Sequence, residues 1–384
     1  MIVDSKKVYI IAGEASGDFI GGVLIEALRH RLPYIDIKGI GGRYMEERDV
    51  PSLFPIKKIS LMGFLEIIPH IFTLKTLIAI AVRDITKEQP DLVITIDSPG
   101  FNFRVVEQLK ASGFQGKFVH IVAPTVWAYK PERAQVIAKL YNHLLTLLPF
   151  EPPFFTKYGL ATDFIGHPVF EQNFDRDTFL FRDKYNIPHD AKIICITPGS
   201  RDGEIKRHMK PFAGALKLLK TKYNIFAVFA LNKREDAELA ASYLHGEVPY
   251  VSVIGDERLD AYAVADIALA KSGTNTLEIA ACATPMVVAY KMNWLSYLYI
   301  KSQVLIKNVC LINVLLEQQI VPELIQGDCT AVKIANTLAQ YLSNDLLSET
   351  QVKDSLKALR MMGFESGTKA SVQAAEIIAR KYLR

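Results

Sequence analysis

A turn at residues 197–201, Thr-Pro-Gly-Ser-Arg, has the composition of a phosphate-binding site. It follows an apolar, β-branched run and precedes a helical pattern, so the N–H groups at the helix start can bind an anion. Ser200 adds a hydroxyl donor, and the planar guanidinium of Arg201 can contact two phosphate oxygens at once. The alternative is a helix start with an ordinary surface arginine, and the order strand, turn, helix favours the phosphate.

A second turn of this kind lies at residues 271–278. Ser272, Gly273 and Thr274 offer donors for a phosphate. Glu278, one helical turn later, can accept hydrogen bonds from both hydroxyls of a ribose. The alternative is that Thr274 and Glu278 only stabilise the helix start. Two phosphate-type turns in the same half of the chain favour a nucleoside diphosphate, and we expect no further cofactor.

Two segments of the first half carry carboxylates next to strand-like runs. Asp97 can take a proton from an attacking hydroxyl as a general base. Capping of the Pro-Gly turn that follows is the simpler interpretation, and residue types alone favour it. Residues 13–18, Gly-Glu-Ala-Ser-Gly-Asp, form a small-residue turn that either binds an anionic or hydroxyl-rich ligand or is capped by Ser16 or Asp18. These two interpretations are equally favoured.

The sequence gives little support for metal or disulfide chemistry. Its Asp-x-Asp segment, residues 175–177, lies in a polar stretch away from any expected strand end, which favours a solvated loop. We therefore expect no metal site. The four cysteines stand apart with no C-x-x-C pair, which favours a reducing compartment.

An apolar stretch at residues 64–82 exceeds what one buried helix stripe needs. A buried core helix and a patch that enters a membrane surface or takes up acyl chains are equally favoured. The candidate contact residues are Phe64, Ile67, Ile68, Ile71, Phe72 and Leu74. Because Glu66, Pro69 and Lys75 interrupt the stretch, it does not match a transmembrane span. The N-terminal apolar run is too short for a signal peptide, so we expect a soluble cytoplasmic protein.

Apolar β-branched runs alternate with helical patterns along the 384 residues, as is typical of βαβ units with parallel sheets. The expected strands are residues 8–12, 92–96, 118–122, 144–148, 193–197, 226–230, 251–254, 267–270 and 286–289. The expected helices include residues 17–30, 104–112, 205–223, 274–282 and 369–383. The motifs above follow strands, where ligands bind in such sheets. A net charge of +4 does not indicate a nucleic-acid partner.

These patterns predict an α/β protein with two Rossmann-like lobes that face a cleft. Residues 1–170 are the expected N-terminal lobe, residues 171–354 the expected nucleotide-binding lobe, and residues 355–384 a helical tail. The tail helix has an apolar side, and its periodicity does not identify the surface on which it packs. The two alternatives are the N-terminal lobe and a dimer partner.

Segments along nearly the whole chain resemble the lipid-A-disaccharide synthase family of inverting GT-B glycosyltransferases. They are residues 12–18, 39–42, 62–67, 97–102, 126–128, 148–151, 164–168, 198–201, 272–278 and 285–292, in the family's order. The resemblance implies transfer of a sugar from UDP-2,3-diacylglucosamine to 2,3-diacylglucosamine 1-phosphate, which yields the lipid A disaccharide phosphate and UDP. A UDP-sugar isomerase on the same fold is the alternative enzyme, and a nucleotide-binding protein without turnover ranks third.

The resemblance also implies roles for particular residues. Asp97 matches the family's essential acidic residue, and the segments at 200–201 and 272–278 match its UDP site. The resemblance thus implies that residues 1–170 are the acceptor-binding lobe and residues 171–354 the UDP-sugar-binding lobe. Asn313 matches an asparagine that supports activity, while Glu14, Ser16 and Asn102 are weaker candidates. The apolar residues near 64–77 match a region of membrane or acyl contact, which implies a peripheral protein on the inner face of the inner membrane. Family members can exchange C-terminal segments, which implies a homodimer.

The chain departs from the family pattern at two positions. Gly100 stands where a second acidic residue is expected, and Ile312 replaces an expected proline before Asn313. Neither departure changes Asp97 or Arg201, so the expected activity stands.

Overall fold

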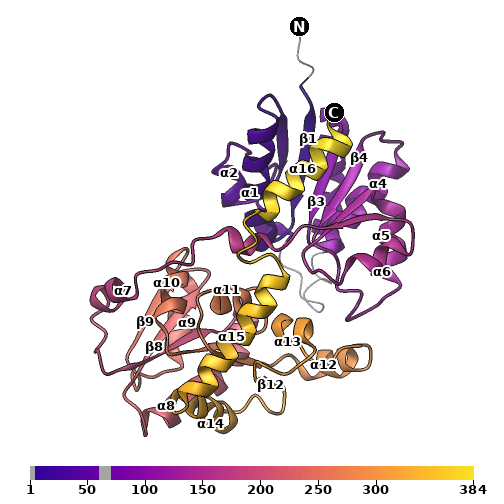
Figure 1. The fold of residues 1–384 in the computed structure, drawn as a ribbon. Coiled ribbons are helices and arrows are strands. Elements are labelled where there is room, and N and C mark those ends of the chain that lie inside the picture. The colour runs from indigo at the N-terminus through magenta and orange to yellow at the C-terminus, as the bar shows by residue number, and fades with distance from the viewer. Residues whose placement is uncertain (1–4, 60–70) are drawn as a thin grey trace. The chain divides into compact units, whose positions relative to one another are not determined.

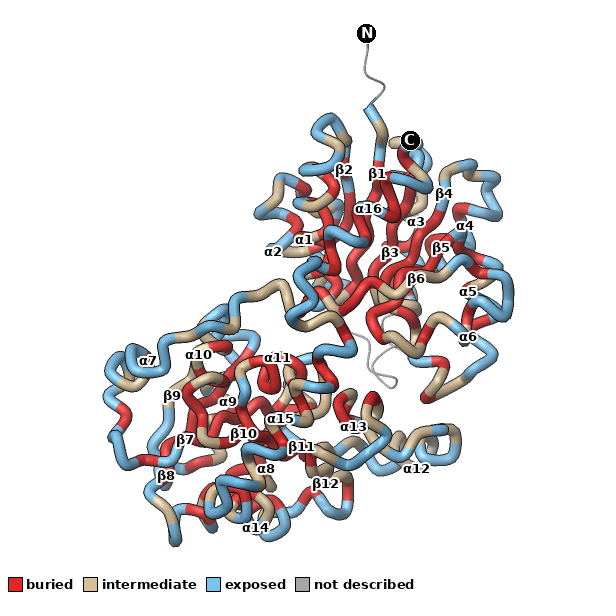
Figure 2. The backbone as a smooth tube through the Cα atoms, viewed as in Figure 1, coloured by how far each residue is buried: buried red, intermediate tan, exposed pale blue. Residues whose placement is uncertain are grey.

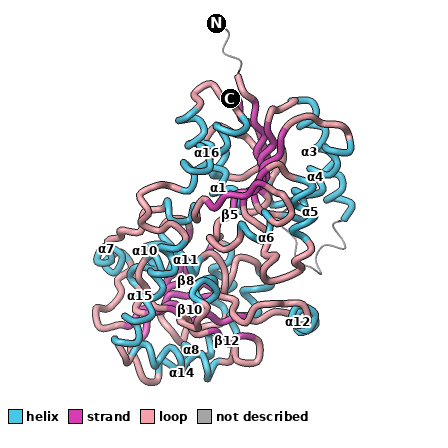
Figure 3. The backbone as a smooth tube through the Cα atoms, turned by 45° about the vertical axis from the view of Figure 1, so that its right-hand side comes forward, coloured by secondary structure: helices cyan, strands magenta, loops and turns pink. Residues whose placement is uncertain are grey.

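The computed structural model describes residues 5–59 and 71–384, which fold into two compact units (Figure 1). Unit 1 comprises Met1–Glu171 and Glu365–Arg384, and unit 2 comprises Gln172–Phe364. In both units helices flank a parallel sheet whose strands are largely buried (Figures 2 and 3). This α/β architecture confirms the predicted pair of Rossmann-like lobes.

Unit 1 contains a six-stranded parallel sheet in the order β2-β1-β3-β4-β5-β6. Its strands are β1 (Lys7–Ala12), β2 (Asp36–Ile40), β3 (Leu92–Ile96), β4 (Lys117–Ile121), β5 (His143–Thr146) and β6 (Ala161–Phe164). Its helices are α1 (Ala15–Arg31), α2 (Arg43–Glu46), η1 (Ile56–Lys58), α3 (Ile71–Glu88), α4 (Pro99–Ala111), α5 (Arg133–Leu140), α6 (Pro152–Thr156), η3 (Pro168–Glu171) and α16 (Ala370–Tyr382). The strand order reverses between β1 and β3, which makes their carboxyl ends the expected ligand position of this sheet.

Unit 2 contains a second six-stranded parallel sheet, in the order β12-β11-β10-β7-β8-β9. Its strands are β7 (Lys192–Thr197), β8 (Ile225–Leu231), β9 (Tyr250–Ile254), β10 (Ile267–Ala270), β11 (Met286–Tyr290) and β12 (Glu323–Ile325). Its helices are α7 (Thr178–Lys184), α8 (Asp202–Lys220), α9 (Glu235–Ser242), α10 (Glu257–Val264), α11 (Asn275–Ala281), α12 (Trp294–Lys301), α13 (Leu311–Leu316), α14 (Ala331–Leu342) and α15 (Asp345–Met361). Here the order reverses between β7 and β10.

The predicted tail at 355–384 is wrong as a single segment. Its first part belongs to α15, which begins at Asp345 and packs within unit 2, while α16 returns to unit 1. The reason is that α15 buries Ala358 and Leu359, and Gln351 donates to the main-chain oxygen of Met286 at 3.0 Å. The chain therefore crosses between the units a second time, near residue 365.

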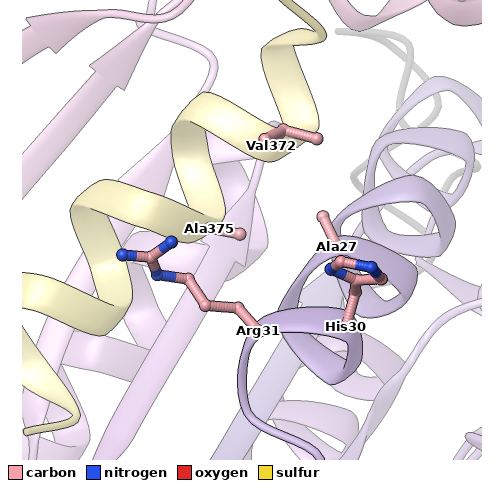
Figure 4. Close-up of a pocket in the computed structure, with 5 residues that line it drawn as sticks. All are labelled: Ala27, His30, Arg31, Val372 and Ala375. Atoms are coloured by element: carbon pink, nitrogen blue, oxygen red, sulfur yellow. The ribbon is translucent and has the colours of Figure 1, made fainter.

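Helix α16 packs back on the N-terminal lobe, which was one of the two predicted alternatives, the other being a dimer partner. Its Ala374, Ala375 and Ile378 share a hydrophobic core with α1. At its start, the carboxylate of Glu171 accepts hydrogen bonds from the amide and hydroxyl of Ser371 at 2.7 and 2.6 Å. The side chains in the hollow between α1 and α16 include those of Arg31 and Ala375 (Figure 4).

The described part of the apolar stretch is a core helix on one face. In α3, Leu74 is only 5% exposed and belongs to the same core as Leu77, Ile78 and Ala81. The predicted membrane contact of Leu74 is therefore wrong, because its side chain packs against the sheet. Phe72, in contrast, is 82% exposed. Phe64, Ile67 and Ile68 lie outside the described residues, as does the side chain of Ile71. Within the described chain, no helix combines the length and the apolar character that a membrane span requires.

Candidate functional site

The two predicted phosphate turns of unit 2 lie side by side at the switch point of the sheet. Thr197 and Ala270 are paired at the ends of β7 and β10, and both strands lead directly into the turns. The amide of Lys271 donates to the main-chain oxygen of Thr197 at 3.0 Å, and Asn275 Nδ2 donates to Thr197 Oγ1 at 2.6 Å. The structure therefore brings Ser200 and Arg201 close to Ser272–Thr274, which fits a ligand with more than one phosphate.

A buried carboxylate, Glu204, connects these two turns, and sequence analysis missed it. Its Oε2 accepts a hydrogen bond from the amide of Ser200 at 3.1 Å, and its Oε1 lies 3.3 Å from Lys271 Nζ and 3.8 Å from an Arg201 guanidinium nitrogen. Burial opposes the charged form, but Lys271, the Ser200 amide and Arg201 outweigh it and lower the pKa of Glu204. The carboxylate thus holds two cations beside the turns.

Gly199 is required by this packing. Its φ of +138° lies in a region that L side chains rarely adopt, and a Cβ there would lie 2.7 Å from the Cβ of Glu204. The turn can therefore bring the chain close to Glu204 only with glycine at this position. A Gly-Ser turn between a strand and a helix was the sequence signal for this site, but it gave no indication of Glu204.

The predicted ribose ligand Glu278 lies in the buried first turn of α11. Its Oε1 accepts a hydrogen bond from Gln172 Nε2 at 3.1 Å, which orients the carboxylate. Gly273 and Thr274 immediately precede α11, and Ser272 donates its hydroxyl to the main-chain oxygen of Val309 at 2.8 Å. The Ser272 hydroxyl therefore also secures a neighbouring loop.

Asn313 is fully buried and uses both ends of its amide within unit 2. Its Oδ1 accepts from the amides of Ile320 and Val321 at 2.9 and 2.8 Å, and its Nδ2 donates to Glu323 Oε1 at 2.7 Å. Glu323 also accepts from the amide of Val309, whose main-chain oxygen binds Ser272. These contacts connect Asn313 to the second turn and make it a positioning residue in this structure.

We expect Asn313→Ala to lower the free energy of unfolding by about 2–4 kcal/mol, because the amides of Ile320 and Val321 lose their acceptor inside unit 2. Asn313→Asp keeps that acceptor but puts a second carboxylate beside Glu323, so it should destabilise the protein as well. Denaturant unfolding of the full chain measures both. Loss of activity in Asn313→Ala with unchanged unfolding would instead make Asn313 a direct ligand contact.

In unit 1 the two carboxylate segments also meet at the switch point of the sheet. Ala12 pairs with Ile96 at the ends of β1 and β3. A Cβ on Gly13 would lie 2.1 Å from the Cβ of Ser98, so only glycine allows this close approach. The structure therefore brings the turn after β1 and the residues after β3 together.

Asp97 follows β3 in an unusual backbone conformation. Asp97 and Ser98 have φ angles of 54° and 45°, which are uncommon for residues other than glycine. Asn102 is fully buried, and its Nδ2 holds this backbone by donating to the main-chain oxygens of Ile96 and Asp97 at 3.2 and 2.7 Å. Strain of this kind persists where the surroundings impose it, often at functional sites.

Asp97 is partly buried. Burial raises its pKa, and a hydrogen bond from the Ser98 backbone opposes this increase. The N-cap residue of α4 is Ser98, and its side chain makes no cap hydrogen bond. A carboxylate of raised pKa at a ligand position is suited to accept a proton.

Helix α1 begins at Ala15, within the predicted turn at residues 13–18, and Asp18 lies buried in its first turn. Asp18 caps a different helix: its Oδ1 and Oδ2 accept from the amides of Gly42 and Tyr44, at 2.7 and 3.0 Å, at the start of α2. Glu14 is partly exposed and Ser16 is exposed, so both side chains are accessible to a ligand. Glu14 is the N-cap residue of α1, and its side chain makes no cap hydrogen bond.

The two departures from the family pattern have different surroundings. A Cβ on Gly100 would meet no atom within 4 Å, so nothing in the structure explains the glycine. Ile312 is fully buried in α13.

A further buried carboxyl in unit 1, Glu151, was not singled out by sequence analysis. It follows β5, and its oxygens accept hydrogen bonds from Trp127 Nε1 and the amide of Leu148, both at 3.1 Å. Burial raises the pKa of Glu151 to about 7, although the Trp127 and Leu148 hydrogen bonds lower it. The hydrogen bond between Trp127 and Glu151 joins the loop after β4 to the loop after β5. The only sequence signal was the presence of both residues in family-like segments.

Because its pKa is higher in the folded chain than the ordinary 4.5, Glu151 should make stability fall as pH rises. The folded protein keeps this proton to about pH 7, whereas the unfolded chain releases it near pH 4.5. That difference corresponds to about 3 kcal/mol. We expect Glu151→Gln to remove this loss of stability between about pH 4.5 and pH 7, as measured by denaturant unfolding at several pH values in that range. Parallel pH dependence in both proteins would contradict the assignment.

The Asp-x-Asp segment has structural roles. Asp177 Oδ1 caps α7 by accepting from the amides of Phe179 and Leu180 at 3.0 and 3.1 Å, and Arg176 forms an ion pair with Asp256 at 2.9 Å. Nowhere in residues 5–59 and 71–384 do three or more His, Cys, Asp or Glu side chains gather as a metal site would require.

Comparison with known proteins gives matches over nearly the full length. A family model described as "Lipid-A-disaccharide synthetase" matches residues 8–378. A protein of Rickettsia felis named lipid-A-disaccharide synthase is 47% identical over 380 residues, which cover 98% of this chain and 97% of the relative. One of Rickettsia akari with the same name is 48% identical over 379 residues, or 98% and 96% of the two chains.

Among solved structures, a Staphylococcus aureus MnaA–UDP co-structure matches with a TM-score of 0.69 and 13% identity, over 98% of this chain and 97% of that one. A UDP-GlcNAc 2-epimerase from Neisseria meningitidis bound to UDP-GlcNAc matches with a TM-score of 0.66 and 13% identity, over 98% and 99%. At such low identity these matches show the fold alone.

Proposed function

The chain belongs to the lipid-A-disaccharide synthetase family, and on this premise we propose that it transfers a sugar from UDP-2,3-diacylglucosamine to 2,3-diacylglucosamine 1-phosphate. The products are lipid A disaccharide 1-phosphate and UDP. The observation that carries this proposal is the position of the carboxylate segments of unit 1 and of the two phosphate-type turns of unit 2. In each unit they follow the two strands at which the sheet order reverses.

Unit 2 is the proposed UDP site. The amides of Ser272 and Thr274 and the hydroxyls of Ser200 and Thr274 bind the diphosphate, with Arg201 contacting its oxygens. The carboxylate of Glu278 accepts hydrogen bonds from the ribose. Lys271 lies 3.3 Å from Glu204, which also keeps Arg201 near the turn, so two cations can offset the charge that develops on the leaving diphosphate.

Unit 1 is the proposed acceptor site, with Asp97 as general base. The acceptor 6-hydroxyl oxygen forms a bond to the anomeric carbon of the donor as the bond from that carbon to UDP breaks. Asp97 takes the hydroxyl proton, and UDP leaves with the bonding electrons. Attack from the face opposite UDP inverts the anomeric carbon. Asn102 holds the Asp97 backbone, while Glu14 and Ser16 are accessible to orient the acceptor.

The lipid substrates also support a peripheral position on the membrane. We propose that the protein is cytoplasmic and contacts the inner face of the inner membrane near the start of α3, where Phe72 is exposed. Phe64, Ile67, Ile68 and Ile71 remain proposed contacts of the same surface. A homodimer formed by exchange of C-terminal segments remains a proposal, for which α16 is the candidate element.

Release of UDP tests this function against the alternatives. The transferase releases UDP from UDP-2,3-diacylglucosamine only when 2,3-diacylglucosamine 1-phosphate is present. A UDP-sugar isomerase would convert the donor without the acceptor, and a binding protein would bind UDP without turnover. The family match favours the transferase, because the likeness to epimerases extends only to the fold.

A further inference from the structure

The segment of unit 2 at residues 291–309, called here the α12 segment, lies in a part of the chain without acidic side chains. No Asp or Glu occurs between Glu278 and Glu317, whereas Lys291, Lys301 and Lys307 do. All three lysines are exposed, and no carboxylate of the described residues forms an ion pair with them. The segment is therefore a positively charged surface.

The α12 segment also exposes large apolar side chains. Trp294 is 61% exposed, Leu298 48% and Leu305 63%. The Trp294 and Tyr297 rings lie 5.8 Å apart, and Lys301 Nζ lies 5.7 Å from the centre of the Tyr297 ring. Helix α12 lies towards the β12 edge of the sheet, away from β9 (Figures 1 and 3). Exposed aromatic and aliphatic groups among lysines are typical of segments that lie in a membrane interface.

Both ends of the α12 segment are fixed to the proposed UDP site. At one end, the amide of Lys291 donates to His208 Nε2 at 2.9 Å, and His208 Nδ1 lies 2.6 Å from the main-chain oxygen of Pro198 in the first turn. At the other end, the main-chain oxygen of Val309 accepts from Ser272 in the second turn. Whatever the α12 segment binds therefore lies next to the proposed nucleotide site.

We propose that the α12 segment docks on an anionic lipid bilayer, with Trp294, Leu298 and Leu305 in the interface and the lysines on lipid phosphates. Unit 2 thus has a lipid contact of its own, additional to the start of α3. The inference rests on the proposed function, because it assumes a lipid donor, and it deepens that function by giving unit 2 a membrane surface. The charge decides the partner: an uncharged hydrophobic groove or acyl chain would leave three exposed lysines without a counter-charge.

Vesicle binding by the full chain without substrate tests the inference. Each basic side chain near an anionic bilayer strengthens binding about fivefold, so Lys301→Glu with Lys307→Glu should weaken binding to vesicles containing phosphatidylglycerol by about 25-fold or more. The matched control is Lys353→Glu with Lys357→Glu, which changes the charge equally on exposed positions of α15. This control should bind nearly as the natural chain does.

Tryptophan fluorescence tests the site of contact. The chain has two tryptophans, and Trp127 donates its hydrogen bond to buried Glu151. Brominated phosphatidylcholine mixed with phosphatidylglycerol should quench the natural chain, and Trp294→Phe should lose this quenching. Equal binding of both double-lysine variants, or equal quenching of Trp294→Phe and the natural chain, would overturn the inference. Quenching that needs the acylated donor and not the bilayer would overturn it in favour of an acyl-chain site.

Acceptor-dependent UDP release in detergent micelles separates this inference from the proposed function. Lys301→Glu with Lys307→Glu should keep this release when micelles replace the bilayer. A natural chain that binds vesicles through Trp294 but releases no UDP would contradict the proposed function and leave the surface intact. Acceptor-dependent UDP release by a natural chain whose Trp294 does not contact the bilayer would support the proposed function and overturn the membrane surface at the α12 segment.

Discussion

Asp97→Asn is expected to lower turnover by about 10²–10⁴-fold, the usual contribution of a positioned general base. The amide has nearly the same shape as the carboxyl but cannot take the proton of the acceptor hydroxyl. UDP binding should persist, because the proposed nucleotide site lies in unit 2. Acceptor-dependent UDP release measures the loss, and titration with UDP measures the binding.

Asp91→Asn is a matched control for Asp97→Asn. Asp91 precedes β3 at the opposite end of the same strand, where its carboxylate accepts from the amide of Lys7 at 2.8 Å. We expect this variant to keep most of its turnover. Full turnover in Asp97→Asn, or an equal loss in both variants, would remove Asp97 from the role of base.

The pH dependence of turnover gives an independent check on Asp97. A general base must be ionised before it can accept a proton, so kcat/KM should fall as the medium becomes more acidic. Burial raises the pKa of Asp97, which places this acidic decline above the ordinary range of an aspartate. The decline should be absent from the residual activity of Asp97→Asn.

Arg201→Ala is expected to lower kcat by about 10²–10³-fold, by analogy with loss of one preorganised donor to a developing negative charge. Glu204 keeps this guanidinium near the turn at residues 197–201, because Glu204 Oε1 lies 3.8 Å from a guanidinium nitrogen of Arg201. Arg201→Lys should recover part of the rate, because an ammonium keeps the charge but cannot contact two oxygens in one plane. Steady-state UDP release measures each rate.

Lys210→Ala is a matched control for Arg201→Ala. Lys210 is exposed on α8, two turns beyond its start, so its loss removes the same charge away from the turn. We expect only a small change in kcat. An Arg201→Ala variant that retains as much activity as Lys210→Ala would show that Arg201 does not act on the leaving diphosphate.

The sequence was sufficient to predict the central strands, and three edge strands were missed for a physical reason. Strands β3 and β10 have the predicted bounds, since strands covered on both faces read as continuous apolar runs. The missed strands β2, β6 and β12 lie at edges of the sheets, where burial is less complete. Without a continuous apolar run, their short sequences resemble loops.

Helix α4 shows a different limit. It begins at Pro99 rather than Arg104, because proline is well suited to the first turn of a helix although it is also a turn residue. The Pro-Gly pair after Asp97 therefore looked like a turn in the sequence. In the structure it opens a helix whose Asn102 reaches back to the Asp97 backbone at 2.7 Å.

The turns of the candidate site were predictable, but the groups that support them were not. Each turn joins a strand to a helix within one short segment, so residue types and spacing identify it. Glu204 and Glu151 act through partners on other elements, namely Lys271 and Trp127. Such contacts depend on strand order, which the expected elements did not specify.

The configuration of the product most directly tests the central claim of a single displacement with Asp97 as base. The purified chain is given UDP-2,3-diacylglucosamine and 2,3-diacylglucosamine 1-phosphate, and the new glycosidic bond is analysed by NMR. The account predicts a disaccharide whose anomeric configuration is opposite to that of the donor, formed with one UDP per bond. Retention of the donor configuration would contradict it, because retention requires a second displacement for which Asp97 as base makes no provision.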